Sequence, residues 1–220
     1  MIDPSFEGRR AFILENTRLQ TPPHTPELEL HLADEITPIW KMTEEDLAEI
    51  GLPPPYWAFA WAGGQALARY ILDNPEVVAG KRVIDFASGS GIVGIAAMKA
   101  GATDVLAADI DGFCGAALSL NAQANGVSVD FTDANLLDAP APAADVILAG
   151  DICYEKPMAD AVMAWLAAAR ARGATVLIGD PGRSYFPRSG LTKLAEYQVA
   201  TTRELEDQEV KKTSVWTLPA

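Results

Sequence analysis

The clearest pattern along the chain is a series of short apolar runs that alternates with helical stretches after residue 80. The runs are apolar throughout, which is typical of strands buried on both faces of a parallel sheet. Apolar residues at helical spacing predict helices between them, each followed at once by a glycine. The predicted strands cover 82–86, 105–109, 127–131, 145–149 and 174–178, and the helices cover 91–100, 112–125 and 158–172.

Both ends of the chain depart from this alternation. Near the C-terminus, 197–205 and 210–218 alternate apolar and polar side chains, which predicts an antiparallel hairpin around 206–208. The first sixty residues are repeatedly interrupted by proline, so they predict an irregular extension. The elements expected before the first buried strand are a strand at 36–41, a helix at 43–51 with Thr43 at its start, and a helix at 63–72.

These elements together predict the fold class and its organisation. Strands that alternate with helices favour an α/β fold with a doubly wound, seven-stranded, Rossmann-like sheet. The terminal antiparallel hairpin supplies its last two strands, and an N-terminal extension packs on the core. We assign residues 1–62 to the extension and 63–220 to the α/β domain.

Composition adds mainly exclusions. The 220 residues are 49% hydrophobic and 21% charged, as expected for one soluble domain. A formal net charge of -13 disfavours nucleic acid and anionic membranes as partners. The two cysteines, Cys114 and Cys153, form no CxxC pair, so we expect neither a disulfide framework nor a metal site. No apolar run approaches the roughly 20 residues of a membrane helix, and we expect a cytoplasmic monomer.

The loop after the first buried strand is the strongest candidate for a ligand site. It reads DFASGSGIVG and contains a GxGxxG pattern. Asp109 ends the next strand, where an acid would bind the hydroxyls of a ribose. The pattern alone indicates a dinucleotide, but the carboxylate of Asp85 would repel a pyrophosphate. The same carboxylate suits the ammonium group of S-adenosylmethionine. The amino-acid end of this cofactor would then lie near Asp85, and its backbone would lie near the glycines.

Alternatives stay open at several of these positions. Asp85 could simply cap the following turn, and the glycines could serve close packing. Asp111 could face solvent or cap the next helix. After the third strand, Asp133 and Asn135 could reach the adenine of the cofactor or merely form a turn.

The fourth buried strand ends in DVILAGDICY, so that Asp151 and Tyr154 follow it in an Asp-x-x-Tyr pattern. With the loop DFASGSG and the upstream segment PYWAFAWAGGQALARYILDNPE, this pattern resembles the seven-strand protein methyltransferases that modify lysine. Within that group the chain is most similar to the lysine methyltransferases acting on the beta subunit of electron transfer flavoprotein. The similarity extends from about Pro54 to the fourth-strand motif.

The resemblance implies a cofactor, a substrate and the residues that contact them. The cofactor is S-adenosylmethionine, with S-adenosylhomocysteine as product, and the partner is a protein, the flavoprotein beta subunit. Family members mostly carry glycine at the position of Ala87, so the methyl group of Ala87 narrows that turn. The residues expected to contact the cofactor are Trp61, Asp85, Ala87, Ser88, Gly89, Gly91, Asp109, Ile110, Asp133, Asn135 and Gly150.

The role of Asp151 follows from the chemistry of methyl transfer. In-line displacement at a sulfonium needs a neutral amine aligned on the methyl carbon, so catalysis is largely positioning plus the loss of one proton. Asp151 could bind and orient the lysine ammonium and help its proton leave, while Tyr154 lines the aliphatic stem. The alternative is that Asp151 caps a helix and Tyr154 packs in the core.

Other functions and other residues compete with this interpretation. A small-molecule methyltransferase is the main rival, because a fold does not determine a substrate. A nicotinamide-dependent oxidoreductase and a binding module without chemistry are further alternatives. Trp57, Phe59 and Trp61 resemble an aromatic cage for a cation or plain packing. Residues 179–183 could line a substrate channel or form a turn.

Overall fold

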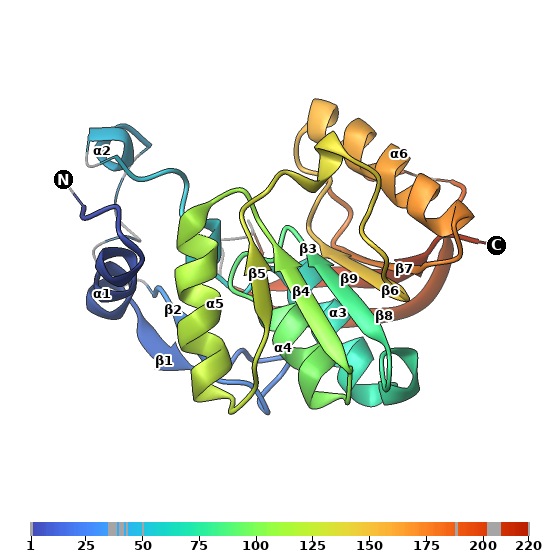
Figure 1. The fold of residues 1–220 in the computed structure, drawn as a ribbon, viewed down its shortest axis with the longest axis horizontal. Helices are drawn as coiled ribbons and strands as arrows, with labels where there is room; N and C mark the ends of the chain where they lie inside the picture. Colours follow the sequence, from blue (N-terminus) through green and yellow to red (C-terminus); the bar gives the residue numbers. More distant parts are fainter. Residues whose placement is uncertain are drawn as a thin grey trace.

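The centre of the molecule is a mixed sheet of seven strands, ordered β5-β4-β3-β6-β7-β9-β8 (Figure 1). The computed structural model describes residues 2–34, 39, 42, 44–49, 51–187, 189–201 and 208–219. β5, β4, β3, β6 and β7 run parallel to one another, whereas β9 is antiparallel to both β7 and β8. The predicted doubly wound sheet and its terminal hairpin are confirmed. The strands are β3 (Arg82–Phe86), β4 (Asp104–Ala108), β5 (Asp130–Thr132), β6 (Val146–Gly150), β7 (Thr175–Asp180), β8 (Thr192–Ala200) and β9 (Val210–Thr217).

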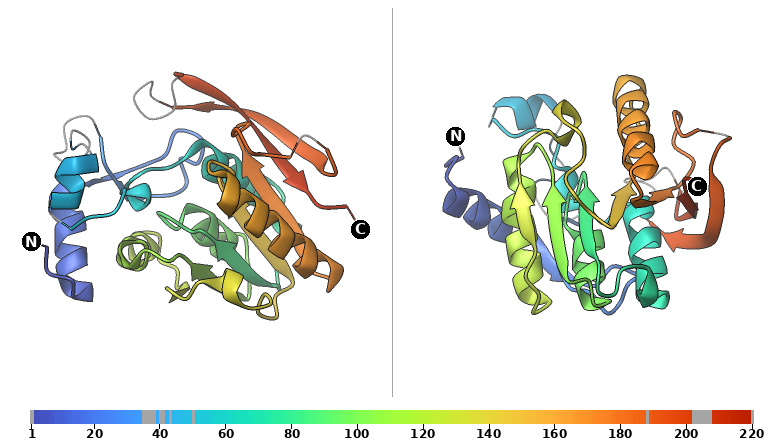
Figure 2. Two further views of the ribbon diagram at one scale, coloured as in Figure 1. Left: turned by 90° about the horizontal axis from the view of Figure 1, so that it is seen from above. Right: turned by 45° about the vertical axis from the view of Figure 1, so that its right-hand side comes forward.

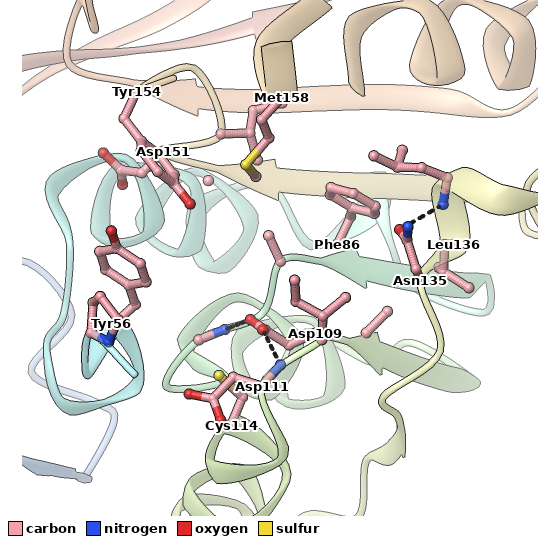
Figure 3. A pocket seen from close by; sticks show the side chains of 18 of the residues that line it. Tyr56, Phe86, Asp109, Asp111, Cys114, Asn135, Leu136, Asp151, Tyr154 and Met158 are labelled. Atoms are coloured by element: carbon pink, nitrogen blue, oxygen red, sulfur yellow. Dashed lines mark hydrogen bonds between the residues drawn. The ribbon is translucent and has the colours of Figure 1, made fainter. Parts of the chain in front are cut away.

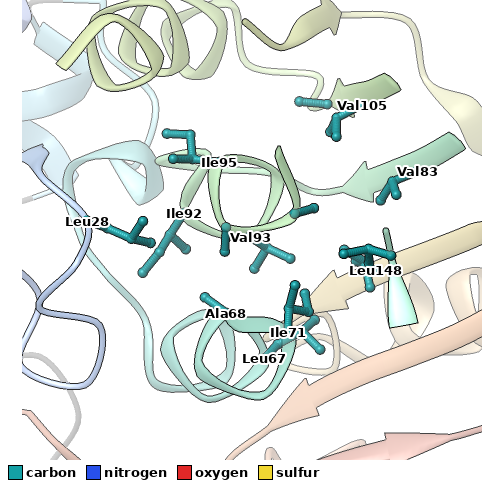
Figure 4. Close-up of a cluster of buried hydrophobic side chains, with 14 of the residues drawn as sticks. Leu28, Leu67, Ala68, Ile71, Val83, Ile92, Val93, Ile95, Val105 and Leu148 are labelled. Carbon is teal, nitrogen blue, oxygen red and sulfur yellow. The ribbon is translucent and has the colours of Figure 1, made fainter. Parts of the chain in front are cut away.

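Two helical layers enclose the sheet. Successive side chains of a strand point to opposite faces, and the two cores follow that alternation. Val83 and Leu148 pack with α3 and α4 (Figure 4), whereas Ile84 and Ile147 pack with α6 on the other face. Among the described residues, no helix is both long and apolar enough to cross a membrane. The helices of the α/β part are α3 (Ala62–Asp73), α4 (Ile92–Lys99), α5 (Gly112–Ala124) and α6 (Lys156–Ala171).

The N-terminal extension packs on α5, at the end of the molecule opposite the terminal hairpin (Figure 2). Helix α1 is capped by the Ser5 hydroxyl, which accepts a hydrogen bond from the backbone N–H of Gly8 at 3.1 Å. Arg10 ties α1 to α5 by donating to the hydroxyl of Ser119 at 2.6 Å. The extension contains α1 (Phe6–Asn16), the antiparallel strands β1 (Arg18–Gln20) and β2 (Leu30–Leu32), and the short helix α2 (Glu44–Glu49).

Helix α1 and the β1–β2 ribbon were absent from the sequence-based prediction. Helix α1 buries Ile13 but leaves Phe6 and Leu14 about half exposed, at 48% and 51%, so it has no continuous apolar stripe. Strands of three residues are too short to show a period. Most of the predicted strand 36–41, and Thr43, lie outside the described residues, and Ile39 alone of that strand is described, as buried. The division at residues 62 and 63 stays a prediction, with α3 beginning at Ala62.

Two strand starts were misplaced by three residues or more, in both cases because backbone pairing decides them, and the other strand boundaries differ from the prediction by at most two residues up to β7. β5 begins at Asp130 rather than at residue 127, because the N–H of Val127 bonds to the carbonyl of Ala122 at the end of α5. β8 begins at Thr192, five residues before the predicted start, since Thr192 already pairs with Thr217 of β9. The predicted turn at 206–208 lies largely outside the described residues.

Candidate active site

A cavity of about 840 Å³ opens at the carboxyl ends of β3, β4 and β6. This is the point where strand order reverses, with β4 on one side of β3 and β6 on the other, and ligands of open α/β sheets bind at such points. Figure 3 shows Tyr56, Asp151 and Tyr154 at one end of the cavity, Asn135 and Leu136 at the other, and Asp109 between them. Its volume lies within the range of roughly 300–1,000 Å³ usual for ligand pockets.

Most of the residues expected at the site line this cavity. Four do not: Ser88 and Asp85 are buried, Gly91 is the N-cap residue of α4, and Asp133 is exposed after β5. The expected residues that line it are Trp61, Ala87, Gly89, Asp109, Ile110, Asn135, Gly150, Asp151 and Tyr154.

The carboxylate of Asp109 joins the loops that follow β3 and β4. One oxygen accepts a hydrogen bond from the N–H of Gly89 at 3.0 Å, and the other accepts from the N–H of Asp111 at 3.1 Å. Asp111 in turn caps α5 by accepting from the N–H of Phe113 at 2.9 Å, and it lines the cavity as well. An acid at the middle of the cavity wall is thereby held in one orientation by backbone donors.

The far end of the cavity is apolar around Asn135. The side chain of Asn135 accepts a hydrogen bond from the N–H of Leu137 at 3.2 Å and donates one to Asp138 at 3.0 Å. Asn135 therefore forms a turn, as one of the two interpretations of the sequence predicted. Leu136, Leu137 and Asn135 nevertheless line the cavity. A ligand at this end of the cavity would therefore contact mainly apolar side chains, which suits a flat ring system.

Ala87 adopts the left-handed backbone conformation, with φ of 55°, in the loop that holds the glycine pattern. That conformation costs an alanine about 1–2 kcal/mol of steric strain. Glycine adopts it without strain but loses more conformational entropy on folding, which costs about 0.5–1 kcal/mol. We therefore expect Ala87→Gly to raise the free energy of unfolding by up to about 1 kcal/mol, measured by urea denaturation.

Ala164, exposed in the middle of α6, is the matched control for Ala87→Gly. Because glycine is a poor helix former, Ala164→Gly should lower the free energy of unfolding by about 1 kcal/mol. A similar loss in Ala87→Gly would contradict the strain inferred at Ala87.

Asp85 lies beneath the glycine loop and not in the cavity wall. Asp85 is only 1% exposed, and its carboxyl group accepts a hydrogen bond from the N–H of Gly94 at 2.8 Å. Burial raises the pKa of Asp85 to about 7, an effect that the Gly94 hydrogen bond opposes and the charge of Asp109 reinforces. Capping of α4 accounts for its contacts, and a role as cofactor ligand stays a prediction.

The raised pKa of Asp85 makes stability depend on pH. Because the folded-state pKa of about 7 lies above the ordinary value of 3.8, the folded chain holds a proton that the unfolded chain releases between these values. The contribution of Asp85 to the free energy of unfolding should be complete below about pH 4 and be lost by about pH 7. Between these values the free energy of unfolding should fall by at most about 1.4 kcal/mol for each pH unit. Urea denaturation from pH 5 to pH 8 measures it.

Asp85→Asn is the control for this pH dependence, because the amide oxygen still accepts from Gly94 but does not titrate. Its free energy of unfolding should fall less steeply between pH 5 and pH 7 than that of the wild type. Equal slopes would mean that Asp85 ionises at its ordinary pKa.

Asp151 is the acid at the other end of the cavity, and two elements hold its carboxylate. One oxygen accepts from the backbone N–H of Gly64, at the start of α3, at 3.0 Å. The other accepts from Arg183 through Nε at 3.0 Å and Nη2 at 2.6 Å. The following helix, α6, has no side-chain cap, so Asp151 does not serve as one there.

Aromatic side chains form the wall beside Asp151. The ring of Tyr56 lies 5.6 Å from that of Tyr154 and 5.9 Å from that of Trp61, between centroids. Tyr154 is 40% exposed, so it does not belong to the core. Burial and the neighbouring Tyr56 raise the pKa of Tyr154 to about 12, so its hydroxyl stays protonated at neutral pH.

The aromatic cage considered from the sequence does not form. Trp57 is fully buried and stacks on Phe113 of α5 at 5.6 Å, so it is a core residue. Phe59 packs edge-on against Trp61 at 5.7 Å, and of the three aromatic residues only Trp61 lines the cavity. Within the described part of the chain, no group of three or more acids, histidines or cysteines could hold a metal ion.

Close backbone packing brings α3 to Asp151. Gly63 and Gly64 begin α3 and lie against Gly150 at the end of β6 and Gly179 in β7. A Cβ on Gly63 would overlap the carbonyl oxygen of Gly179 and meet the carboxylate of Asp151. Gly150, expected beside the cofactor, is also required by this packing, since a Cβ there would lie 3.0 Å from the backbone of Gly64.

Several lining residues were not identified from the sequence. Tyr56 is one of several aromatic residues that follow three prolines, and Met158 and Cys114 are apolar residues on helices, so no local signal distinguishes any of them. Arg183 belongs to the segment 179–183, whose interpretation was left between a channel and a turn. Arg183 forms the turn, since its N–H donates to the Asp180 carboxylate at 2.8 Å, and its side chain also lines the cavity, whereas a substrate channel stays a prediction.

Comparisons with known proteins agree with one another on a methyltransferase fold. The family model of ribosomal protein L11 methyltransferase (PrmA) matches residues 65–167. The chain is 38% identical to the electron transfer flavoprotein beta subunit lysine methyltransferase of Xenopus laevis, over 94% of this chain and 85% of that protein. For the Homo sapiens protein of the same name the identity is 37%, over 98% of this chain and 82% of that protein.

A solved structure supports the fold independently. It is that of magnesium protoporphyrin IX methyltransferase from Synechocystis PCC 6803 with bound SAM, which matches with a TM-score of 0.51 at 14% identity. The match covers 71% of this chain and 78% of that chain. At such low identity the likeness concerns the arrangement of strands and helices alone.

Proposed function

The chain belongs to the electron transfer flavoprotein beta subunit lysine methyltransferase family. On that premise we propose that it methylates lysine side chains of this flavoprotein subunit, and that its own Asp151 and Tyr154 bind the lysine. As a member of the family it is a protein-lysine methyltransferase that depends on S-adenosylmethionine. The observation that carries the proposal is a carboxylate fixed beside an aromatic wall at one end of the cavity, with a second carboxylate at its middle.

The cavity suits S-adenosylmethionine in size and in chemistry. When bound, this cofactor supplies a methyl group on a sulfonium, which an amine can displace. Asp109 would hold the ribose hydroxyls, and the loop at Ala87 and Gly89 would follow the methionine part. The apolar end around Leu136 and Asn135 would receive the adenine, with Ile110 and Trp61 completing the wall.

Asp151 would receive the lysine and orient its nitrogen. Its carboxylate can accept hydrogen bonds from an ammonium and then help one proton leave, which exposes the lone pair that attacks. The hydrogen bond from Gly64 fixes one carboxylate oxygen and so limits the directions from which a lysine can approach. Tyr154, protonated at neutral pH, would act as a wall or a hydrogen-bond donor and not as the base.

Methylation of the purified flavoprotein beta subunit tests the proposal. The protein is incubated with that subunit and S-adenosylmethionine carrying a labelled methyl group, and the modified lysines are located by mass spectrometry. Label on lysine supports the proposed substrate. Label on other proteins of a cell lysate but not on this subunit would overturn the substrate and keep the activity.

Two further measurements exclude the rival functions. Label found in a protein-free metabolite extract, and on no protein, would indicate a small-molecule methyltransferase. Calorimetric titration should give a binding isotherm with S-adenosylhomocysteine and none with NADH, and the reverse would favour an oxidoreductase.

The remaining predictions about partners follow from the sequence. A net charge of -13 supports the absence of nucleic acid and favours a cationic, lysine-bearing surface on the substrate. A monomer in the cytoplasm is the state we expect, and both cysteines are free and buried.

A further inference from the structure

Arg183 lies where a cation from the substrate would have to bind. Its guanidinium donates to Asp151 through Nε and Nη2, at 3.0 and 2.6 Å, and its central carbon lies 5.7 Å from the centre of the Trp61 ring. A carboxylate and an aromatic face are the two groups that a protein uses to bind an alkylammonium. Both are thus engaged by a cation of the chain itself.

We infer that Arg183 is an internal substitute for the substrate lysine: its guanidinium occupies the acceptor position at Asp151 and is displaced when the lysine ammonium binds. The inference rests on the proposed function, in which Asp151 receives the lysine. It adds a residue that sets the affinity for the protein substrate without contacting the reacting atoms.

Burial of Asp151 gives a physical reason for an internal cation. The side chain of Asp151 is 12% exposed and that of Arg183 is 20% exposed, so water screens neither charge well. An ionised carboxylate left without a partner in such a place is strongly unfavourable. Exchange of one cation for another keeps the carboxylate paired both before the lysine arrives and while its ammonium is bound.

The backbone geometry allows the side chain of Arg183 to leave without unfolding its loop. The Asp180 carboxylate, at the end of β7, accepts from the N–H of Gly182 at 2.7 Å and from the N–H of Arg183 at 2.8 Å. These bonds anchor the main chain of the turn. The long arginine side chain can then rotate away from Asp151 while its Cα stays in place.

A competing internal cation weakens the apparent affinity for substrate, because the substrate can bind only during the fraction of time that the acceptor position is vacant. The apparent dissociation constant is the intrinsic one divided by that fraction. Arg183→Met removes the charge and keeps an unbranched apolar stem over Trp61. We expect its KM for the flavoprotein subunit to fall by about five-fold or more. Arg183→Lys retains a cation and should keep a KM close to that of the wild type.

Arg82→Met is the control for the loss of one positive charge. Arg82 pairs with Asp145 at the opposite end of β3, and both side chains are about half exposed, at 53% and 44%. The two methionine variants therefore change the net charge equally, but only Arg183→Met should change KM. Arg183→Gln gives the same comparison should the methionine variant not fold, as judged by thermal unfolding and S-adenosylhomocysteine binding.

A second readout uses a small cation in place of the missing side chain. Ethylguanidinium should inhibit Arg183→Met competitively against the protein substrate and should inhibit the wild type much less. An unchanged or higher KM in Arg183→Met, with a lower kcat, would overturn the inference and make Arg183 a residue that positions Asp151. Failure of the wild type to methylate any protein would overturn the proposed function and the inference together.

Discussion

Asp151→Asn should reduce the methylation rate of the protein substrate by about 100-fold or more, the usual contribution of a group that transfers or holds a proton. Asparagine has the same shape, accepts from the N–H of Gly64 as the carboxylate does, and tolerates the left-handed backbone at this position, where φ is 56°. The variant therefore keeps the backbone contact with Gly64 but removes the charge and the oxygen that accepts from Arg183. Initial rates with labelled cofactor measure the effect.

Cofactor binding separates loss of chemistry from loss of structure in Asp151→Asn. The dissociation constant for S-adenosylhomocysteine should stay within about three-fold of the wild type, or about 0.7 kcal/mol. Asp160→Asn removes an exposed acid that pairs with Lys156 on α6, and it should methylate at the parental rate. Methylation by Asp151→Asn at the parental rate would exclude the role assigned to Asp151.

Gly63→Ala should lower the free energy of unfolding by about 3 kcal/mol, at the upper end of the usual cost of overpacking. The added Cβ would overlap the backbone carbonyl of Gly179 and meet the carboxylate of Asp151. Backbone cannot rotate aside, so α3 must move away from the sheet. The hydrogen bond from Gly64 to Asp151 would then lengthen, and the methylation rate should fall together with stability. Urea denaturation and initial rates measure the two effects.

Gly64→Ala is the neighbouring control for Gly63→Ala. Its Cβ would lie 3.2 Å from Cγ2 of Ile92, a side chain that can shift. Alanine also favours the helix by about 1 kcal/mol over glycine, so we expect a change in stability within about 1 kcal/mol. Equal losses in the two variants would mean that the contact of Gly63 with Gly179 does not determine the position of α3.

The strands after residue 80 could be predicted because each carries its own signal. Apolar residues fill β6 and the middle of β7 and predominate in β3, which predicts burial on both faces. β5 and β8 were misplaced at their starts because apolar character does not reveal where pairing begins. Helix α1 was missed since it buries few side chains and depends on contacts with α5, such as that of Arg10 with Ser119.

The candidate site was predictable where a residue type and its position at a strand end suffice. Asp109 and Asp151 each follow a buried strand, and the carboxyl ends of parallel strands meet at one edge of a sheet. Asp85 instead lies within β3, one residue before its end, and it points to the same face as Val83, so strand alternation places its side chain beneath α4.

The order of strands and helices, the glycine loop and the acids at two strand ends were determined by the sequence itself, since short-range periodicity and the chemistry of single residues specify them. Tertiary structure alone decided which side chains meet. Arg183 reaches Asp151 because β6 and β7 are neighbours, with the N–H of Asp151 bonded to the carbonyl of Gly179 at 3.0 Å. Asp151 and Arg183 are 32 positions apart in the sequence, and only the packing of α3 against β6 and β7 brings their partners Gly64 and Trp61 to the same place.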